Sequence, residues 1–222
     1  MWGRNSTGFP QMPFIRAIRL LAVVTVTLVA VVACGRSRAP PDDVVVNNGT
    51  PRRVELVAWA TDAFQSSGLR WPPVHEISFP PTNGCSGGLM GKYTTTDEGC
   101  RIELCAVGGL SHQEGALPLL AKHTLLHELG HCWVDAFVDD LARVQFMDLR
   151  QLECWHCDTF WEVKGFEHAA EVIAWGVSDT FYYVHVSPRD CQSMNRAFMM
   201  LTGQQPLQRL ADCSDELIDG FH

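Results

Sequence analysis

The spacing of apolar residues divides the chain into helical and extended segments. Apolar residues recur every three or four positions in four stretches, which predicts helices over about 52–68, 117–138, 166–180 and 188–201. Between the first two helices, apolar residues alternate or form short runs, which predicts strands over 74–79, 87–96 and 100–107. This order of helix, strands and further helices predicts an α+β fold with a small mixed sheet.

The N-terminal apolar run has a different meaning. Arg16 and Arg19 precede the stretch from Leu20 to Cys34, and this pattern is typical of an export signal. The last four residues of the run, 31–34, resemble the lipobox of bacterial lipoproteins. That resemblance implies a signal peptide at 1–33 and a lipidated Cys34 that anchors an exported protein to a membrane of the cell envelope. A plain signal peptide, giving a secreted protein, and an uncleaved anchor remain alternatives.

The segment after this signal sets the domain boundaries. Residues 34–51 are rich in Pro, Gly, Asn and charge, and they are interpreted as a flexible tether. Residues 52–222 then form a single domain. Residues 1–33 hold three arginines and no acidic residue, so the remaining chain is more acidic than the whole-chain net charge of −8. Without a cluster of Lys and Arg, nucleic-acid binding is not expected.

Cysteine usage supports export. Eight cysteines follow Cys34, and an even number outside the cytoplasm suggests disulfides, although the sequence does not give their connectivity. Cys154 and Cys157 have the CxxC spacing of redox and zinc-ribbon sites. There is no second CxxC for a ribbon and no strand-to-helix context for a redox dithiol, so structural half-cystines are favoured. Cys132 is interpreted as a disulfide or core residue.

The stretch "HTLLHELGHCW", residues 123–133, carries the candidate chemistry. His127 and His131 are four residues apart, so on a helix both side chains share one face and can bind one ion. Glu128 projects to a different side and can act as general base on a metal-activated water. Gly130 would allow another backbone to approach the helix closely. The competing interpretation is a core helix with two hydrogen-bonded histidines.

A catalytic zinc needs a third protein ligand. The histidine found six residues after the second one in metzincins is replaced here by Phe137, which excludes that family. The stretch "GFEHAAEVIAW", residues 165–175, is helical in period and carries Glu167 and Glu171 on one face. Acidic residues on an otherwise apolar helix are costly to bury unless they are paired or bind a metal.

Together, "HELGH" and the downstream "EHAAE" resemble the gluzincin type of the zincin-like metalloproteases. The resemblance covers about residues 101–180 and implies a zincin-like fold. It also implies that Zn²⁺ is bound by His127, His131 and Glu167, with Glu171 orienting His127. The family often has Asn where Phe166 stands, and its thermolysin branch has Asp where Glu171 stands, so the two glutamates could exchange roles.

The resemblance also suggests how substrate binds. In zincins an edge strand ahead of the active-site helix binds extended substrate, and residues 100–107 occupy that position in the sequence. Tyr182, Tyr183 and His185 are candidate oxyanion donors, and His185 is taken as the catalytic candidate among them. His123 is expected at the rim of the site or behind a ligand, and His168 on the solvent side.

These features predict a zinc metallopeptidase, an endopeptidase acting on peptide or protein substrates at the extracytoplasmic face. The alternative is a lipid-anchored binding protein that keeps the zincin fold without catalysis. Neither the substrate preference nor the oligomeric state follows from the sequence.

Overall fold

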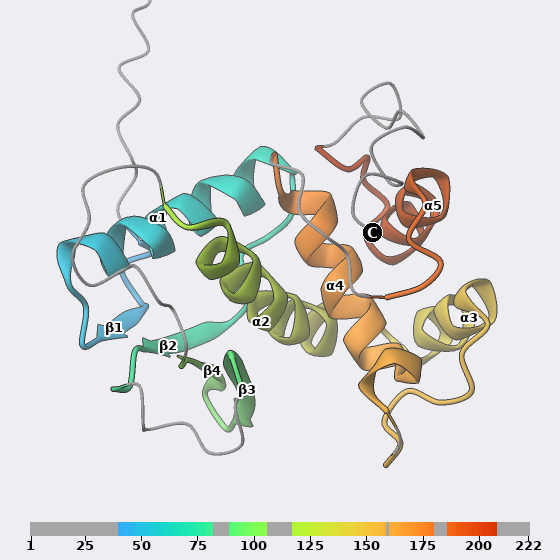
Figure 1. Ribbon diagram of the computed structural model, residues 1–222, viewed down its shortest axis with the longest axis horizontal. Coiled ribbons are helices and arrows are strands. Elements are labelled where there is room, and N and C mark those ends of the chain that lie inside the picture. Colours follow the sequence, from blue (N-terminus) through green and yellow to red (C-terminus); the bar gives the residue numbers. More distant parts are fainter. Residues whose placement is uncertain (1–39, 82–88, 106–116, 159, 180–185, 208–222) are drawn as a thin grey trace, which may run out of the picture. The chain divides into compact units, whose positions relative to one another are not determined.

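The computed structural model describes residues 40–81, 89–105, 117–158, 160–179 and 186–207. Within these ranges the chain is a mixed α/β protein with five α-helices, one short 3₁₀ helix and a four-stranded sheet (Figure 1). The elements are β1 (Val45–Asn47), α1 (Pro51–Ser66), β2 (Val74–Ser78), β3 (Gly91–Thr96), β4 (Gly99–Leu104), α2 (Leu119–Phe137), α3 (Asp140–Arg150), η2 (Trp161–Val163), α4 (Gly165–Val177) and α5 (Cys191–Thr202). The signal segment 1–33 and Cys34 lie outside the described residues.

The predicted small mixed sheet is confirmed, but its edge was assigned to the wrong strand. The strand order is β1-β2-β4-β3, with β1, β2 and β4 parallel and β3 antiparallel to β4. Because β4 pairs with β2 on one side and β3 on the other, residues 99–104 cannot accept an added strand. The hairpin instead carries β3 to the outside, so β3 is the edge strand beside α2.

Besides η2, two elements lie where none was predicted. Val45–Asn47, in the segment interpreted as a tether, form β1 and pair with β2, and the neighbouring Val44 is buried. Helix α3 follows α2 directly. It begins at an N-cap, Asp139, whose side chain accepts a hydrogen bond from the Ala142 N–H. The ordered domain therefore begins before residue 52.

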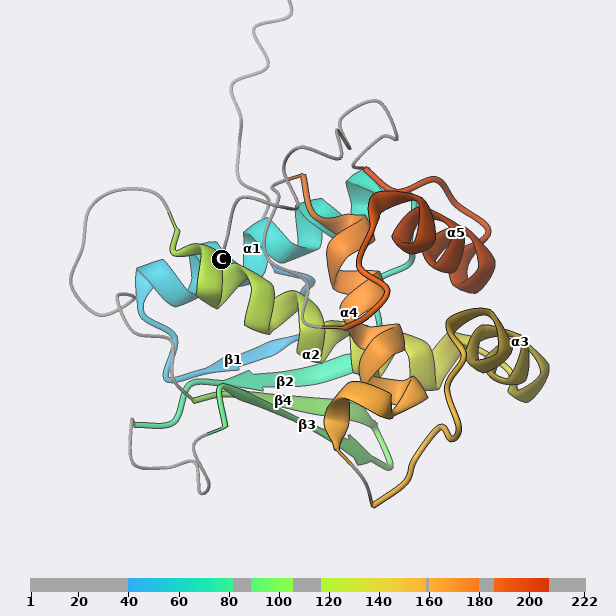
Figure 2. The same cartoon turned by 45° about the vertical axis from the view of Figure 1, so that its right-hand side comes forward.

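Helices α2 and α4 form the centre of the domain, and α1 and α2 lie on one face of the sheet (Figure 2). The predicted close approach at Gly130 is confirmed, since a Cβ there would lie 2.6 Å from the carbonyl oxygen of Ala170 on α4. Helix α4 packs against α2, α3 and α5, so nearly all of it is buried. The expectation of an exposed His168 is wrong for this reason: the residue is buried.

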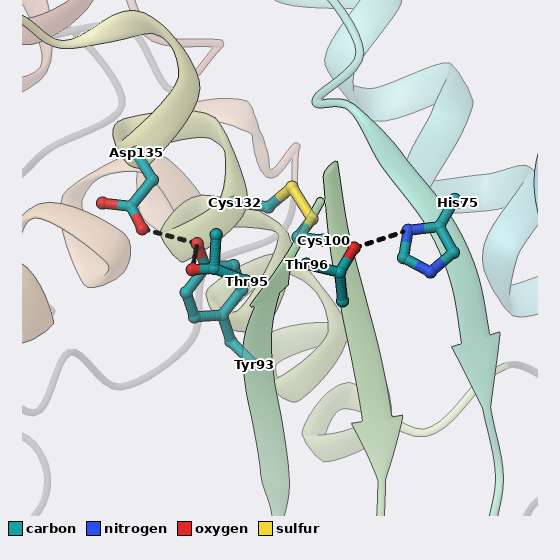
Figure 3. Close-up of a disulfide and its surroundings, with 7 residues drawn as sticks. All are labelled: His75, Tyr93, Thr95, Thr96, Cys100, Cys132 and Asp135. Atoms are coloured by element: carbon teal, nitrogen blue, oxygen red, sulfur yellow. Dashed lines mark hydrogen bonds between the residues drawn. A yellow bond between two sulfur atoms is a disulfide. The ribbon is translucent and has the colours of Figure 1, made fainter. Parts of the chain in front are cut away.

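Disulfides reinforce this arrangement. Cys100 on β4 is bonded to Cys132 on α2, which ties the sheet to the helix one residue beyond His131 (Figure 3). Cys154 and Cys157 are bonded to each other, so both are half-cystines. Cys105 and Cys191 each take part in a further disulfide. Such bonds are typical of proteins exported to an oxidising environment. Among the described residues, no helix is both long and apolar enough to cross a membrane.

Candidate metal centre

Three side chains from α2 and α4 converge on one point. The Nε2 atoms of His127 and His131 are 3.1 Å apart. The Oε2 atom of Glu167 lies 3.2 Å from each of them. Helix geometry explains the convergence: the two histidines stack one turn apart on α2, and α4 crosses close enough at Gly130 for Glu167 to reach both.

The size of this triangle matches a tetrahedral metal site. Zinc bound to nitrogen or oxygen at about 2.0–2.1 Å places neighbouring ligand atoms about 3.3–3.4 Å apart. The three observed separations, 3.1 to 3.2 Å, are only slightly shorter. Lone pairs at this spacing repel one another unless a proton or a cation lies between them. Two imidazoles and a carboxylate are also a ligand set that zinc accepts.

A second group overlaps the first but differs in character. Glu171 Oε2 lies 2.9 Å from Nε2 of His123 and 3.0 Å from Nδ1 of His127. These three residues could also hold a metal ion by their proximity alone. However, one carboxylate oxygen accepting two N–H donors is already a complete hydrogen-bonding arrangement. His127 therefore offers Nδ1 to Glu171 and keeps Nε2 for the triangle with His131 and Glu167.

The electrostatics of the site favour positive charge at its centre. Burial acts to lower the pKa of His127, but hydrogen bonds to Glu167 and Glu171 outweigh it and raise this pKa to about 10. Burial lowers the pKa of His131 to about 4. For both glutamates, burial acts to raise the pKa, yet the histidines hold it well below its usual range. The two ionised carboxylates thus stabilise a positive charge beside the imidazoles, and a divalent cation would supply that charge in place of the proton on His127.

His131 is held differently from His127. Its Nδ1 atom is buried and has no hydrogen-bond partner in the described part of the chain. Its ring instead stacks on Phe166, with centroids 4.2 Å apart, and lies 5.7 Å from the ring of Tyr93. The Tyr93 hydroxyl donates to the carboxylate of Asp135, one turn beyond His131 (Figure 3). Aromatic packing therefore orients this imidazole.

Glu128 lies beside the triangle and is mostly buried. Burial, followed by the nearby charge of Glu167, raises its pKa to about 7, although His127 acts in the opposite direction. Glu128 lines the same cleft as the three converging residues. A carboxyl group with a pKa near neutrality is suited to exchanging protons with a reacting group.

The cleft has a volume of about 480 Å³ and lies between β3, α2, η2 and α4. Its polar floor is formed by the histidines and glutamates described above. Its walls are largely apolar and include Leu89, Leu120, Trp161 and Phe166. A buried polar floor beneath apolar walls is typical of small-molecule and peptide sites.

The sequence had indicated most of this site. His127, Glu128, His131, Glu167 and Glu171 come together as expected. His123 contacts Glu171 as well as lining the cleft, so it lies both behind a candidate ligand and near the surface. His185, Tyr182 and Tyr183 lie outside the described residues. The chain matches no protein-family model, no curated protein and no solved structure.

Proposed function

We propose that the protein is a zinc-dependent metallopeptidase with a zincin-like active site. The observation that carries this proposal is the triangle formed by His127, His131 and Glu167, with Glu128 facing the same cleft. Each residue has a separate role. The three converging residues hold the ion, Glu171 fixes the ring of His127, and Glu128 handles protons.

The chemistry follows from these positions. When bound, Zn²⁺ supplies Lewis acidity toward the scissile carbonyl and the attacking water. Glu128 accepts a proton from that water and delivers it to the leaving amine. Burial raises the pKa of Glu128, which suits a carboxyl group that accepts and then donates a proton near neutral pH.

The edge strand provides a place for the substrate. β3 pairs only with β4 among the described strands, and Gly91, Lys92 and Tyr93 line the cleft. An extended peptide can add to this edge through main-chain hydrogen bonds. Leu89 and Leu120 are exposed at the cleft, so we expect peptides with large apolar side chains near the cleaved bond to bind best.

Metal analysis and a peptidase assay test the proposal together. The purified protein should retain one zinc ion per chain and cleave unfolded polypeptide. Glu128→Gln should keep the zinc and the thermal midpoint but lose cleavage, because the amide cannot accept the proton. If the wild-type protein contains no zinc, the proposed metal site is wrong. Zinc without cleavage by wild type would favour the silent binding protein, and full activity in Glu128→Gln would remove Glu128 as the base.

We further propose that the protein is exported and lipid-anchored at Cys34. The disulfides support export, and the lipobox-like residues 31–34 support the anchor. Cys34→Ser should release the protein from membranes into the soluble fraction. Quantitative retention of this variant in membranes would instead indicate an uncleaved apolar segment.

A further inference from the structure

Gly91, the first residue of β3, contacts the candidate base directly. A Cβ placed on Gly91 would lie 2.5 Å from Oε1 of Glu128, 2.8 Å from its Cγ and 2.9 Å from its Cδ. Ordinary contacts between such atoms are about 3.5 Å or longer. The Glu128 side chain therefore lies against the bare α-carbon of this residue.

The backbone does not require glycine here. Among the described glycines, only Gly68, Gly99 and Gly203 have positive φ angles. Gly91 pairs in regular antiparallel register with Leu104 and has a conformation that any residue adopts. A glycine inside a strand is unfavourable unless something approaches its α-carbon closely. In this strand, the approaching group is the Glu128 carboxylate.

A comparison with Gly130 shows what is unusual about this contact. A Cβ at Gly130 would meet backbone atoms of Ala170, which cannot move without shifting α4. The three atoms nearest to a Cβ at Gly91 would all belong to the Glu128 side chain, from Cγ to the carboxylate, and to no backbone. Substitution at Gly130 should therefore cost stability, whereas substitution at Gly91 should cost little stability but displace Glu128.

From this contact we infer that Gly91 is a positioning residue for the proposed hydrolysis: its missing side chain creates the space that holds the Glu128 carboxylate beside the metal-binding triangle. The inference rests on the proposed function and extends it to the edge strand. β3 thus has two roles, because the strand expected to seat the peptide also sets the position of the base.

The test substitutes Gly91 with alanine and uses Thr94→Ala, an exposed change on the same strand, as the matched control. Gly91→Ala should retain zinc and keep or slightly raise the thermal midpoint, since alanine suits this backbone. To relieve the contact, the carboxylate must move by about 1 Å. A displacement of that size in a catalytic group lowers kcat by about 100-fold. Thr94→Ala should leave zinc content, kcat and KM unchanged.

A second background isolates the role of Glu128. Glu128→Asp shortens the side chain by one methylene and withdraws it from residue 91. In this background, adding Gly91→Ala should lower kcat by less than about threefold, because little contact remains to be relieved. An equal loss in both backgrounds would overturn the inference. So would a rise in KM with unchanged kcat, since the new methyl group would then be obstructing substrate.

Crystal structures of metal-free wild type and Gly91→Ala give a readout that needs no activity. The Glu128 carboxylate should lie about 1 Å farther from residue 91 in the variant. If it has not moved, the inference fails while the proposed function is untouched. If wild type proves inactive, the proposed function fails, and the displaced carboxylate still decides whether Gly91 positions Glu128.

Discussion

Glu167 and Glu171 carry the same carboxyl group one turn apart on α4, yet their surroundings differ. The Glu167 side chain is 25% exposed and its Oε2 faces the Nε2 atoms of His127 and His131. The Glu171 side chain is 1% exposed and its Oε2 accepts from His123 and from Nδ1 of His127. His127 is thus held between two acids, one at each ring nitrogen.

This difference gives the two acids different roles: Glu167 is placed to bind the ion, and Glu171 is placed to orient His127, which binds it. Glu167 lies at the cleft, where its oxygen completes a triangle that only a proton or a cation can stabilise. Glu171 is almost fully buried in the floor of the cleft, and its Oε2 atom accepts hydrogen bonds from the ring N–H groups of His123 and His127. Spacing along α4 cannot distinguish the two roles, because both residues share one helical face. The pairing of each acid with a particular ring nitrogen does distinguish them.

The largest expected effect is that of Glu167→Ala. Its removal leaves two protein ligands, fewer than the three on which catalytic zinc sites rely. Zinc should no longer copurify with this variant, and peptidase activity should be lost. Metal analysis after dialysis against a weak chelator measures the loss, with Glu171→Ala as the matched comparison. If Glu171→Ala loses the metal and Glu167→Ala keeps it, the two roles are reversed.

Glu171→Ala should have the next largest effect. Zinc should still bind, but with affinity or activity reduced about 10–100-fold, the usual loss when a residue that orients a metal ligand is removed. Titration with a competing zinc chelator measures the affinity. Glu171→Gln is the informative companion, because its amide oxygen can accept one of the two N–H bonds and should recover part of the loss. An unchanged zinc affinity in both variants would show that Glu171 does not orient His127.

The features that the sequence predicted depend on residues close together in the chain, whereas those it missed depend on contacts between distant segments. The sequence predicted His127, Glu128, His131 and both glutamates because each group lies on a single helix, where spacing fixes the shared face. It assigned the wrong edge strand because strand order depends on pairing between distant segments. His168 was misplaced because three helices pack around α4 and bury the side on which it lies.

Other features were missed because the sequence around them gave little indication of their role. Gly91 looked like an ordinary strand residue, since the Glu128 side chain that fills its space comes from α2. Helix α3 was missed although Asp139 supplies an N-cap. Several of its apolar residues, including Leu141 and Val144, are exposed, so its pattern does not mark a single buried face. Phe166 was recognised as an apolar helix position and as a departure from the gluzincin pattern, but its stacking on His131 was not expected.

A smaller effect is expected for His123→Ala, which tests whether the histidine acts through Glu171. Losing one N–H donor to a buried carboxylate should weaken zinc binding roughly tenfold. In the Glu171→Ala background the same substitution should add almost nothing, because the acceptor is already gone. Additive losses would mean that His123 contacts the ion or the substrate independently.

The smallest expected effect concerns the other histidine. His127 is fixed by a hydrogen bond to Glu171, whereas His131 is oriented by stacking on Phe166. Phe166→Leu keeps an apolar side chain of similar reach but removes the ring. An aromatic pair contributes about 0.5–1.5 kcal/mol beyond its buried area, which corresponds to about a two- to tenfold loss in zinc affinity. Phe137→Leu, a change on α2 away from the cleft, serves as the control and should leave zinc affinity unchanged. If Phe166→Leu binds zinc as tightly as wild type, stacking on Phe166 does not orient His131, and this contrast between the two histidines disappears.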